Sequence, residues 1–272
     1  MSALMKSITL DQFPRLIRDA LKLAHPTWLP VLVEGLCAMQ EADAAYLPSL
    51  QEGAFLPDSG RIFAAFSEPI TNVRYVLVGE GPYPRAESAT GLCFMDGAVH
   101  ELWSSDVQAG LSKKVNRATS LRNFIKMLLV ADGQLESHRT TGEALAQVAL
   151  KARGIGSPLI QGLPELQANL ARQGFLLLNA TLVYRAQVKP LKEARAWLPF
   201  LQTVLNGLAD QAQQQIVAPP TLVLWGKIAE VLNTLPCNVR FAKVISEHPY
   251  NLSFITNASM QTLFAPMQLL QK

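Results

Sequence analysis

The stretch RYVLVGEGPYP (residues 74–84) contains the signal that decides the fold. A continuous apolar run that ends at a glycine is typical of a strand buried on both faces, because polar residues do not alternate along it. Three further runs have the same form: GFLLLNA (174–180), TLVLWG (221–226) and VRFAKVIS (239–246). The chain is therefore expected to contain four buried strands.

Segments with helical periodicity lie before, between and after these runs. They cover 8–24 (with Asp11 as N-cap), 28–45, 120–133, 142–153, 163–174, 193–215, 226–235 and 259–272, and the Pro- and Gly-rich residues 46–60 are expected to form a loop. Strands that alternate with helices predict an α/β fold, with a central, mostly parallel four-stranded sheet covered by helices on both faces. We expect a single domain over 1–272, with N-terminal helices in 1–60 and the core and its active-site loops in 74–272.

The composition is that of a globular protein, with 49% hydrophobic and 17% charged residues in a chain of 272. No apolar run reaches the roughly 18 residues of a membrane span, and the first residues lack a signal core, so a cytoplasmic protein is expected. A monomer is the default expectation, because nothing in the sequence indicates the oligomeric state. The net charge of +3 permits nucleic-acid binding without indicating it. The cysteines Cys37, Cys93 and Cys237 form no C-x-x-C pair, and no metal or other cofactor is expected.

Each predicted strand ends at a polar residue or a glycine. The first three end at Gly79, Asn179 and Gly226, and the fourth continues into SEHP (246–249). Ligands of open α/β sheets bind beyond the carboxyl ends of the strands, which places one site at these four exits. The first exit loop lacks the G-x-G-x-x-G and G-x-x-x-x-G-K patterns, so a dinucleotide or P-loop site is excluded.

The individual residues allow two interpretations each. Phe94 is either a core aromatic or a stacking surface for a planar ligand. Asn179 is either a turn residue or an amide that reads a base edge, and His248 is either structural or a proton donor.

Taken together, the four exit segments resemble a known family. GEGPYPRAESATGLCF, LLLNATLVYR, LVLWGK and HPYNLS are similar, in this order, to signature segments of the uracil-DNA glycosylases. The resemblance is closest to the family whose members carry G-Q-D-P-Y-H, G-L-C-F, L-L-L-N and H-P-S-P-L-S. It covers most of the chain, since ATSLRNFIKML (118–128) also resembles that family's serine loop and the following helix.

The resemblance implies an enzyme of DNA repair that flips uracil out of single- or double-stranded DNA and hydrolyses its N-glycosidic bond. It implies that Phe94 stacks on the uracil ring and that Asn179 binds the base edge and rejects cytosine. Tyr83 would exclude the methyl group of thymine, and His248 would donate a hydrogen bond to the departing base. Gly81 and Pro82 would complete the loop that contacts the substrate.

The same resemblance implies a set of DNA contacts outside the base pocket. Leu252 would act as a wedge that fills the gap left by the flipped base. Ser120, Lys227 and Ser253 would contact backbone phosphates, and such contacts are independent of sequence and sensitive to salt.

The chain departs from the family pattern at the position that matters most for catalysis. Gly81 stands where the family carries its catalytic aspartate, Glu80 replaces a glutamine and Pro84 replaces a histidine. The aspartate positions the attacking water and stabilises the oxocarbenium-like sugar, and glycine can do neither.

Three accounts of this departure compete. In the first, which we favour, the enzyme is active by other means, with Glu80 ordering the water as in superfamily branches that carry G-E-A-P-G in this loop. In the second, a catalytically impaired homologue serves as a DNA- or protein-binding module. In the third, Glu80 and Tyr250 reshape the pocket for a different modified base. A noncatalytic scaffold on the same fold is a further reading, because fold does not determine function.

Overall fold

A computed structural model of the chain describes residues 10–58, 60–106 and 109–272. Four parallel strands form one sheet in the order β2-β1-β3-β4. The strands are β1 Tyr75–Gly79, β2 Phe175–Asn179, β3 Thr221–Trp225 and β4 Lys243–Ser246. The predicted α/β fold with a central four-stranded parallel sheet is therefore confirmed.

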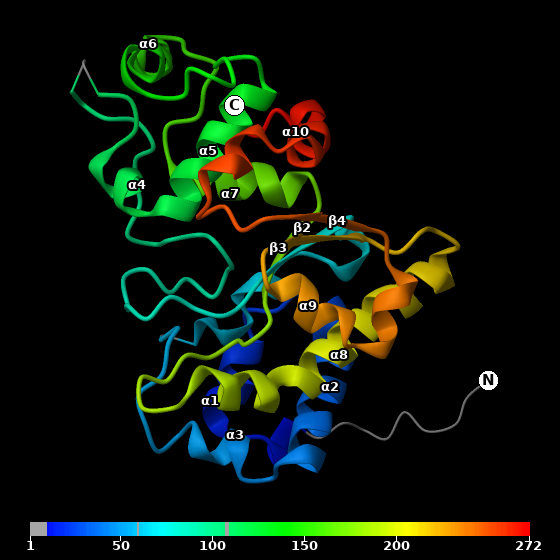
Figure 1. The fold of residues 1–272 in the computed structure, drawn as a ribbon. Coiled ribbons are helices and arrows are strands. Elements are labelled where there is room, and N and C mark those ends of the chain that lie inside the picture. Colours follow the sequence, from blue (N-terminus) through cyan, green and yellow to red (C-terminus); the bar gives the residue numbers. More distant parts are fainter. Residues whose placement is uncertain (1–9, 59, 107–108) are drawn as a thin grey trace.

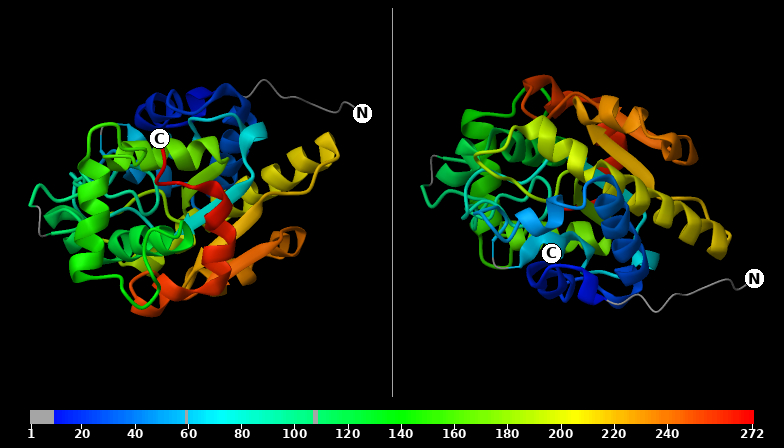
Figure 2. Two further views of the ribbon diagram at one scale, coloured as in Figure 1. Left: turned by 90° about the horizontal axis from the view of Figure 1, so that it is seen from above. Right: turned by 90° about the horizontal axis from the view of Figure 1, so that it is seen from below.

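Helices cover both faces of this sheet (Figure 1). The upper layer of Figure 1 contains α4 Lys113–Arg117, α5 Thr119–Ala131, α6 Gly142–Arg153, α7 Leu163–Arg172 and α10 Ala258–Phe264. The lower layer contains α1 Arg15–Leu21, α2 Leu29–Ala42, α3 Tyr46–Ser49, α8 Pro190–Gln215 and α9 Ile228–Asn233. Figure 2 shows these two layers from above and from below.

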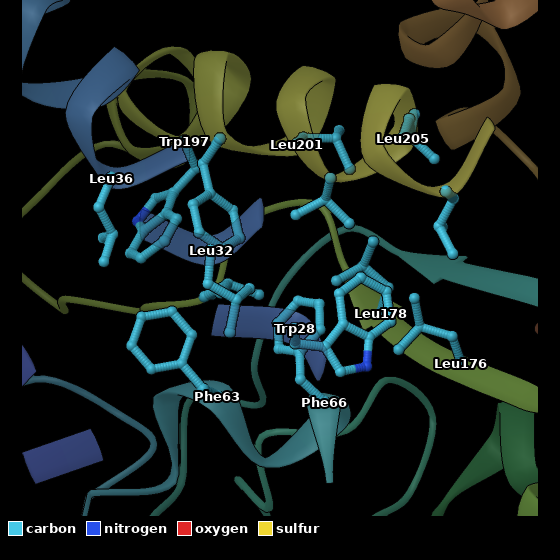
Figure 3. Close-up of a cluster of buried hydrophobic side chains, with 14 of the residues drawn as sticks. Trp28, Leu32, Leu36, Phe63, Phe66, Leu176, Leu178, Trp197, Leu201 and Leu205 are labelled. Atoms are coloured by element: carbon cyan, nitrogen blue, oxygen red, sulfur yellow. The ribbon is translucent and has the colours of Figure 1, made fainter. Parts of the chain in front are cut away.

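The strands form two cores because successive side chains point to opposite faces of the sheet. Val76 and Val78 of β1 belong to the lower core, whereas Leu77 between them belongs to the upper core. Figure 3 shows the lower core, in which Leu176 and Leu178 lie near Trp28 and Phe66. Burial on both faces explains why the central strands read as continuous apolar runs.

The fourth predicted strand is shorter than expected. The prediction covered 239–246, but Pro236–Arg240 forms a 3₁₀ helix and β4 begins only at Lys243. β4 is an edge strand in which only Ser246 is buried, so it does not have the doubly buried environment that the sequence indicated.

Four predictions about helices, their caps and a loop are also wrong. The first predicted helix is confined to α1, which Pro14 precedes as N-cap, and residues 8 and 9 of that prediction lie outside the described part. Asp11 caps none of the helices in the described ranges and instead accepts a hydrogen bond of 2.8 Å from Arg18. The expected loop at 46–60 contains α3, and the last predicted helix ends with α10 at Phe264.

A buried polar network joins α3 to α8. Arg185 Nε donates to Glu193 Oε1 at 2.5 Å, and the hydroxyl of Tyr46 donates to Glu193 Oε2 at 2.5 Å. Trp197 Nε1 donates to the Tyr46 oxygen at 2.6 Å. The side chains of Arg185 and Glu193 are 9% and 4% exposed. If one partner of this ion pair is removed, little solvent can therefore reach the other to take its place.

We predict that Glu193→Gln lowers the free energy of unfolding by about 3–5 kcal/mol, because it leaves the buried charge of Arg185 uncompensated. Urea denaturation measures this loss. Asp210→Asn is the matched control, since it breaks the more exposed pair of Asp210 with Arg240 and is expected to cost no more than about 1 kcal/mol. Equal losses in both variants would contradict the prediction.

Candidate active site

The carboxyl ends of the four strands open into one cavity. β1 and β3 lie side by side, and the chain leaves them toward opposite edges of the sheet, which makes their exits the topological switch point. A cavity of about 710 Å³ lies at these exits. Its lining comes from the ends of β1, β2 and β3, from the chain after β1, β3 and β4, and from α5 and α9. It includes Glu80, Gly81, Tyr83, Phe94, Ser120, Asn179, Trp225, Gly226, Lys227, Glu247, His248 and Tyr250.

The floor of the cavity is formed where β1 and β2 end. Gly79 pairs with Asn179 in the parallel register, and Asn179 is 2% exposed. A Cβ atom at Gly79 would lie 2.7 Å from Cys93 Cβ and 3.0 Å from Asn179 Oδ1, so only glycine lets these residues meet. Asn179 Oδ1 is buried and has no hydrogen-bond partner among the described residues. An unpaired buried acceptor is costly, and this one is available for a donor on a ligand.

Phe94 forms an aromatic wall with Trp225. Their ring centroids are 4.7 Å apart, and the centroid of His248 lies 5.8 Å from that of Phe94. Phe94 has a φ of 59°, a left-handed conformation that bulky side chains rarely adopt. Such local strain concentrates at ligand sites, where the surrounding structure holds a side chain in a required direction.

His248 is oriented as a hydrogen-bond donor. Its Nδ1 accepts from the backbone N–H of Tyr250 at 3.1 Å, so in the neutral ring the proton resides on Nε2. Burial lowers the pKa of His248, although the carboxylate of Glu80 opposes this shift. Gly226 has a φ of 73°, and a Cβ there would lie 2.9 Å from His248 Cβ, so glycine also permits this approach.

The loop after β1 presents a different kind of glycine. Thr181 N–H donates to the carbonyl of Glu80 at 3.1 Å, which ties this loop to the residues that follow β2. A Cβ at Gly81 would meet nothing closer than Thr181 at 3.5 Å, an ordinary contact. Gly81 is therefore not required by packing. Tyr83 follows in the same loop, and burial raises the pKa of its phenol.

The structure brings most, but not all, of the predicted site residues together. Glu80, Gly81, Tyr83, Phe94, Asn179 and His248 line the cavity, with Ser120 and Lys227. Pro82 does not line it, and instead lines a second cavity of about 410 Å³ beside it. Leu252 and Ser253 lie outside the lining in the 3₁₀ helix Leu252–Thr256, where Leu252 is 69% exposed.

Sequence reasoning missed two residues that shape the site. Trp225 ends β3 and supports Phe94, and its apolar run gave no sign of this role. Asn123 of α5 is fully buried and donates from Nδ2 to the Pro249 carbonyl at 2.7 Å. The signal for Asn123 was a polar residue on the apolar face of a helix, where an amide must find partners.

The described residues contain no group of three or more His, Cys, Asp or Glu side chains suited to a metal ion. None of the helices in the described ranges combines the length and apolarity needed to cross a membrane.

The chain is similar in structure and sequence to known proteins. No family model matches the chain. The crystal structure of the wild-type UNG from Nitratifractor salsuginis is 38% identical, with a TM-score of 0.82, and the match covers 94% of this chain and 96% of that chain.

Curated proteins of similar sequence include uracil-DNA glycosylases from two further bacteria. The Corynebacterium glutamicum protein is 28% identical over 236 residues, covering 84% of this chain and 81% of its own. The Leuconostoc mesenteroides protein is 23% identical over 235 residues, covering 85% and 86%.

We predict that His248 titrates below the ordinary histidine pKa of about 6.5, because burial disfavours the imidazolium. The measurement is a ¹⁵N NMR titration of the imidazole, with His248→Gln assigning the signal. Since the folded pKa is depressed, wild type should lose stability relative to His248→Gln as the pH falls through the ordinary value, and not above it. A midpoint at or above the ordinary value would contradict the prediction.

Proposed function

This chain belongs to the uracil-DNA glycosylase superfamily, and we propose that it removes uracil, or a related damaged base, from DNA by hydrolysing the N-glycosidic bond. The observation that carries the proposal is the unpaired, buried Oδ1 of Asn179. It lies in the same cavity as an aromatic wall, Phe94, and a neutral donor, His248. A planar base with a donor on its edge satisfies all three groups at once.

Asn179 accounts for the selection of uracil over cytosine. Uracil presents an N3–H donor beside the O4 acceptor, which matches the acceptor and donors of one side-chain amide. Cytosine presents an acceptor at N3 and an amino donor at position 4, so it would leave the Asn179 amide opposed by like groups. Mismatched buried polar groups discriminate strongly between otherwise similar ligands.

Phe94 and Tyr83 complete the recognition of the base in this proposal. Phe94 stacks on one face of the ring, a contact that aromatic side chains make with any base. Tyr83 stands in the same lining and would exclude a methyl group at position 5, which separates uracil from thymine.

His248 stabilises the departing base. As the glycosidic bond breaks, negative charge develops on the uracil oxygens, and the Nε2–H of neutral His248 donates to this charge. A donor that is already in place needs no reorganisation during the reaction. Its neutral state follows from the burial that lowers its pKa.

Glu80 is the group that we propose in place of the missing aspartate. Its side chain is close enough to His248 to influence the pKa of the imidazole, and it belongs to the same cavity lining. A carboxylate there can order the attacking water and stabilise the positive charge that develops on the sugar.

The rim of the cavity suits DNA. Ser120 and Lys227 line the cavity, and in this proposal they contact phosphates beside the flipped nucleotide. Leu252 and Ser253 are exposed in the 3₁₀ helix Leu252–Thr256 that follows His248, and in this proposal they act as a wedge and as a further phosphate contact.

The test is incubation with single- and double-stranded oligonucleotides that contain uracil, followed by cleavage at abasic sites. Abasic product is expected from uracil and not from matched cytosine or thymine oligonucleotides. Tight binding to uracil DNA without product would favour an impaired homologue that acts as a binding module, a reading that Gly81 supports. If the protein gives no product and also does not bind uracil DNA, the proposed glycosylase function is refuted.

We predict that Glu80→Gln lowers kcat by at least about 100-fold, because the amide can neither accept a proton nor stabilise the sugar cation. Single-turnover kinetics on uracil oligonucleotides measure the effect. Glu230→Gln is the matched control, since Glu230 lines the same cavity from α9 but has no role in the proposed chemistry. Similar losses of kcat in both variants would contradict the prediction, because they would show that the rate depends on the net charge of the cavity and not on the position of Glu80.

We predict that Gly81→Asp raises activity, because a Cβ atom at this position makes only ordinary contacts and the carboxylate restores the group of the related family. Gly81→Asn has nearly the same shape without the charge, and activity should not rise in that variant. Unchanged or lower activity of Gly81→Asp in the same kinetic assay would show that Glu80 provides an arrangement that a second carboxylate disturbs.

A further inference from the structure

We infer that Asn123 of α5 is a positioning residue that holds His248 in its donor geometry. The geometric part of this inference stands on the structure, and its kinetic part rests on the proposed function. Asn123 does not line the cavity and so acts only through the loop that it holds.

Asn123 clamps the chain directly after His248. Its side chain is fully buried, and Nδ2 lies 2.7 Å from the carbonyl oxygen of Pro249. The same nitrogen lies 3.4 Å from the carbonyl oxygens of Tyr250 and Asn251, so three successive carbonyls face one amide. The 2.7 Å contact is the strong bond, and the two longer ones are weak.

One peptide plane connects this clamp to the imidazole. The carbonyl of Pro249 and the N–H of Tyr250 belong to the same peptide unit, which is planar and rigid. Asn123 binds the carbonyl end of this unit, and the N–H end donates to His248 Nδ1 at 3.1 Å. Fixing the carbonyl therefore aims the N–H at Nδ1, which keeps the ring proton on Nε2 and directs Nε2 toward the cavity.

The ends of the loop are held separately from its middle. Asn257 Nδ2 donates to Glu247 Oε2 at 2.9 Å, and this pair closes the segment from Glu247 to Asn257. Burial raises the pKa of Glu247, but hydrogen bonds from Ser253 and Asn257 outweigh it and leave the pKa below its usual range. Loss of the Asn123 amide should thus release His248 without unfolding the loop.

Asn169 of α7 provides a matched control. Its side chain is buried, and Nδ2 donates to the carbonyls of Leu269 and Gln271 at 2.7 and 2.6 Å. None of these residues lines the cavity. Asn169→Leu therefore removes an equivalent clamp on the chain at a place where it does not hold His248.

The first experiment is independent of activity. In wild type, a through-bond ¹⁵N–¹⁵N coupling between the Tyr250 amide and His248 Nδ1 is expected, with a single Nε2–H tautomer. In Asn123→Leu, the coupling should vanish and the two ring nitrogens should move toward averaged shifts, whereas Asn169→Leu should match wild type. Absence of the coupling in wild type, or its persistence in folded Asn123→Leu, would overturn the inference. If Asn123→Leu does not fold, Asn123→Ala, which also lacks the Nδ2 donor, takes its place under the same criteria.

The second experiment is a double-mutant cycle on uracil oligonucleotides. Asn123→Leu should lower kcat by about 100-fold, the scale of a small misplacement of a reacting group. In a His248→Gln background it should cost almost nothing further, whereas Asn169→Leu should leave kcat nearly unchanged in both. Additive losses would overturn the role through His248. If wild type shows no activity, the proposed function fails while the NMR experiment still tests the clamp.

Discussion

The parallel register between β1 and β2, in which Gly79 meets Asn179, is the constraint on which the cavity depends. It brings the ends of the two strands as close as a glycine allows, since a Cβ at 79 would lie 2.7 Å from Cys93 Cβ, a distance that real Cβ atoms do not show, and would make a tight contact of 3.0 Å with Asn179 Oδ1. Because β3 and β4 continue the same parallel sheet, Gly226 and His248 emerge at the same edge. The parallel direction of the strands therefore determines where the site lies, and no single side chain does so.

The glycines at this edge have different physical meanings. Gly79 and Gly226 are demanded by close neighbours, and Gly226 also by its left-handed backbone. Gly81 has neither requirement, because a Cβ there would make only ordinary contacts. Packing therefore does not explain the lack of a side chain at Gly81, and the neighbouring Glu80 is the carboxylate that we propose for the catalytic role.

Buried amides in this protein divide into two kinds. Asn123 and Asn169 donate to backbone carbonyls and stabilise the loops that they hold. Asn179 leaves its carbonyl oxygen unpaired, at a cost of about 1–3 kcal/mol for such a group. A protein that keeps this unpaired acceptor beside the strained Phe94 gives up stability where a ligand can restore it.

The sequence by itself predicted the four-stranded parallel sheet, most of the helices and the four strand exits, because burial of a strand on both faces leaves a continuous apolar run in the sequence. It also pointed to Asn179 and His248, since each stands at or just after the end of a predicted strand. Only the tertiary structure decided that β4 is a short edge strand and that Pro82 faces a second cavity. It alone revealed the clamp from Asn123, because hydrogen bonds between residues more than a hundred positions apart leave no periodic trace in the sequence.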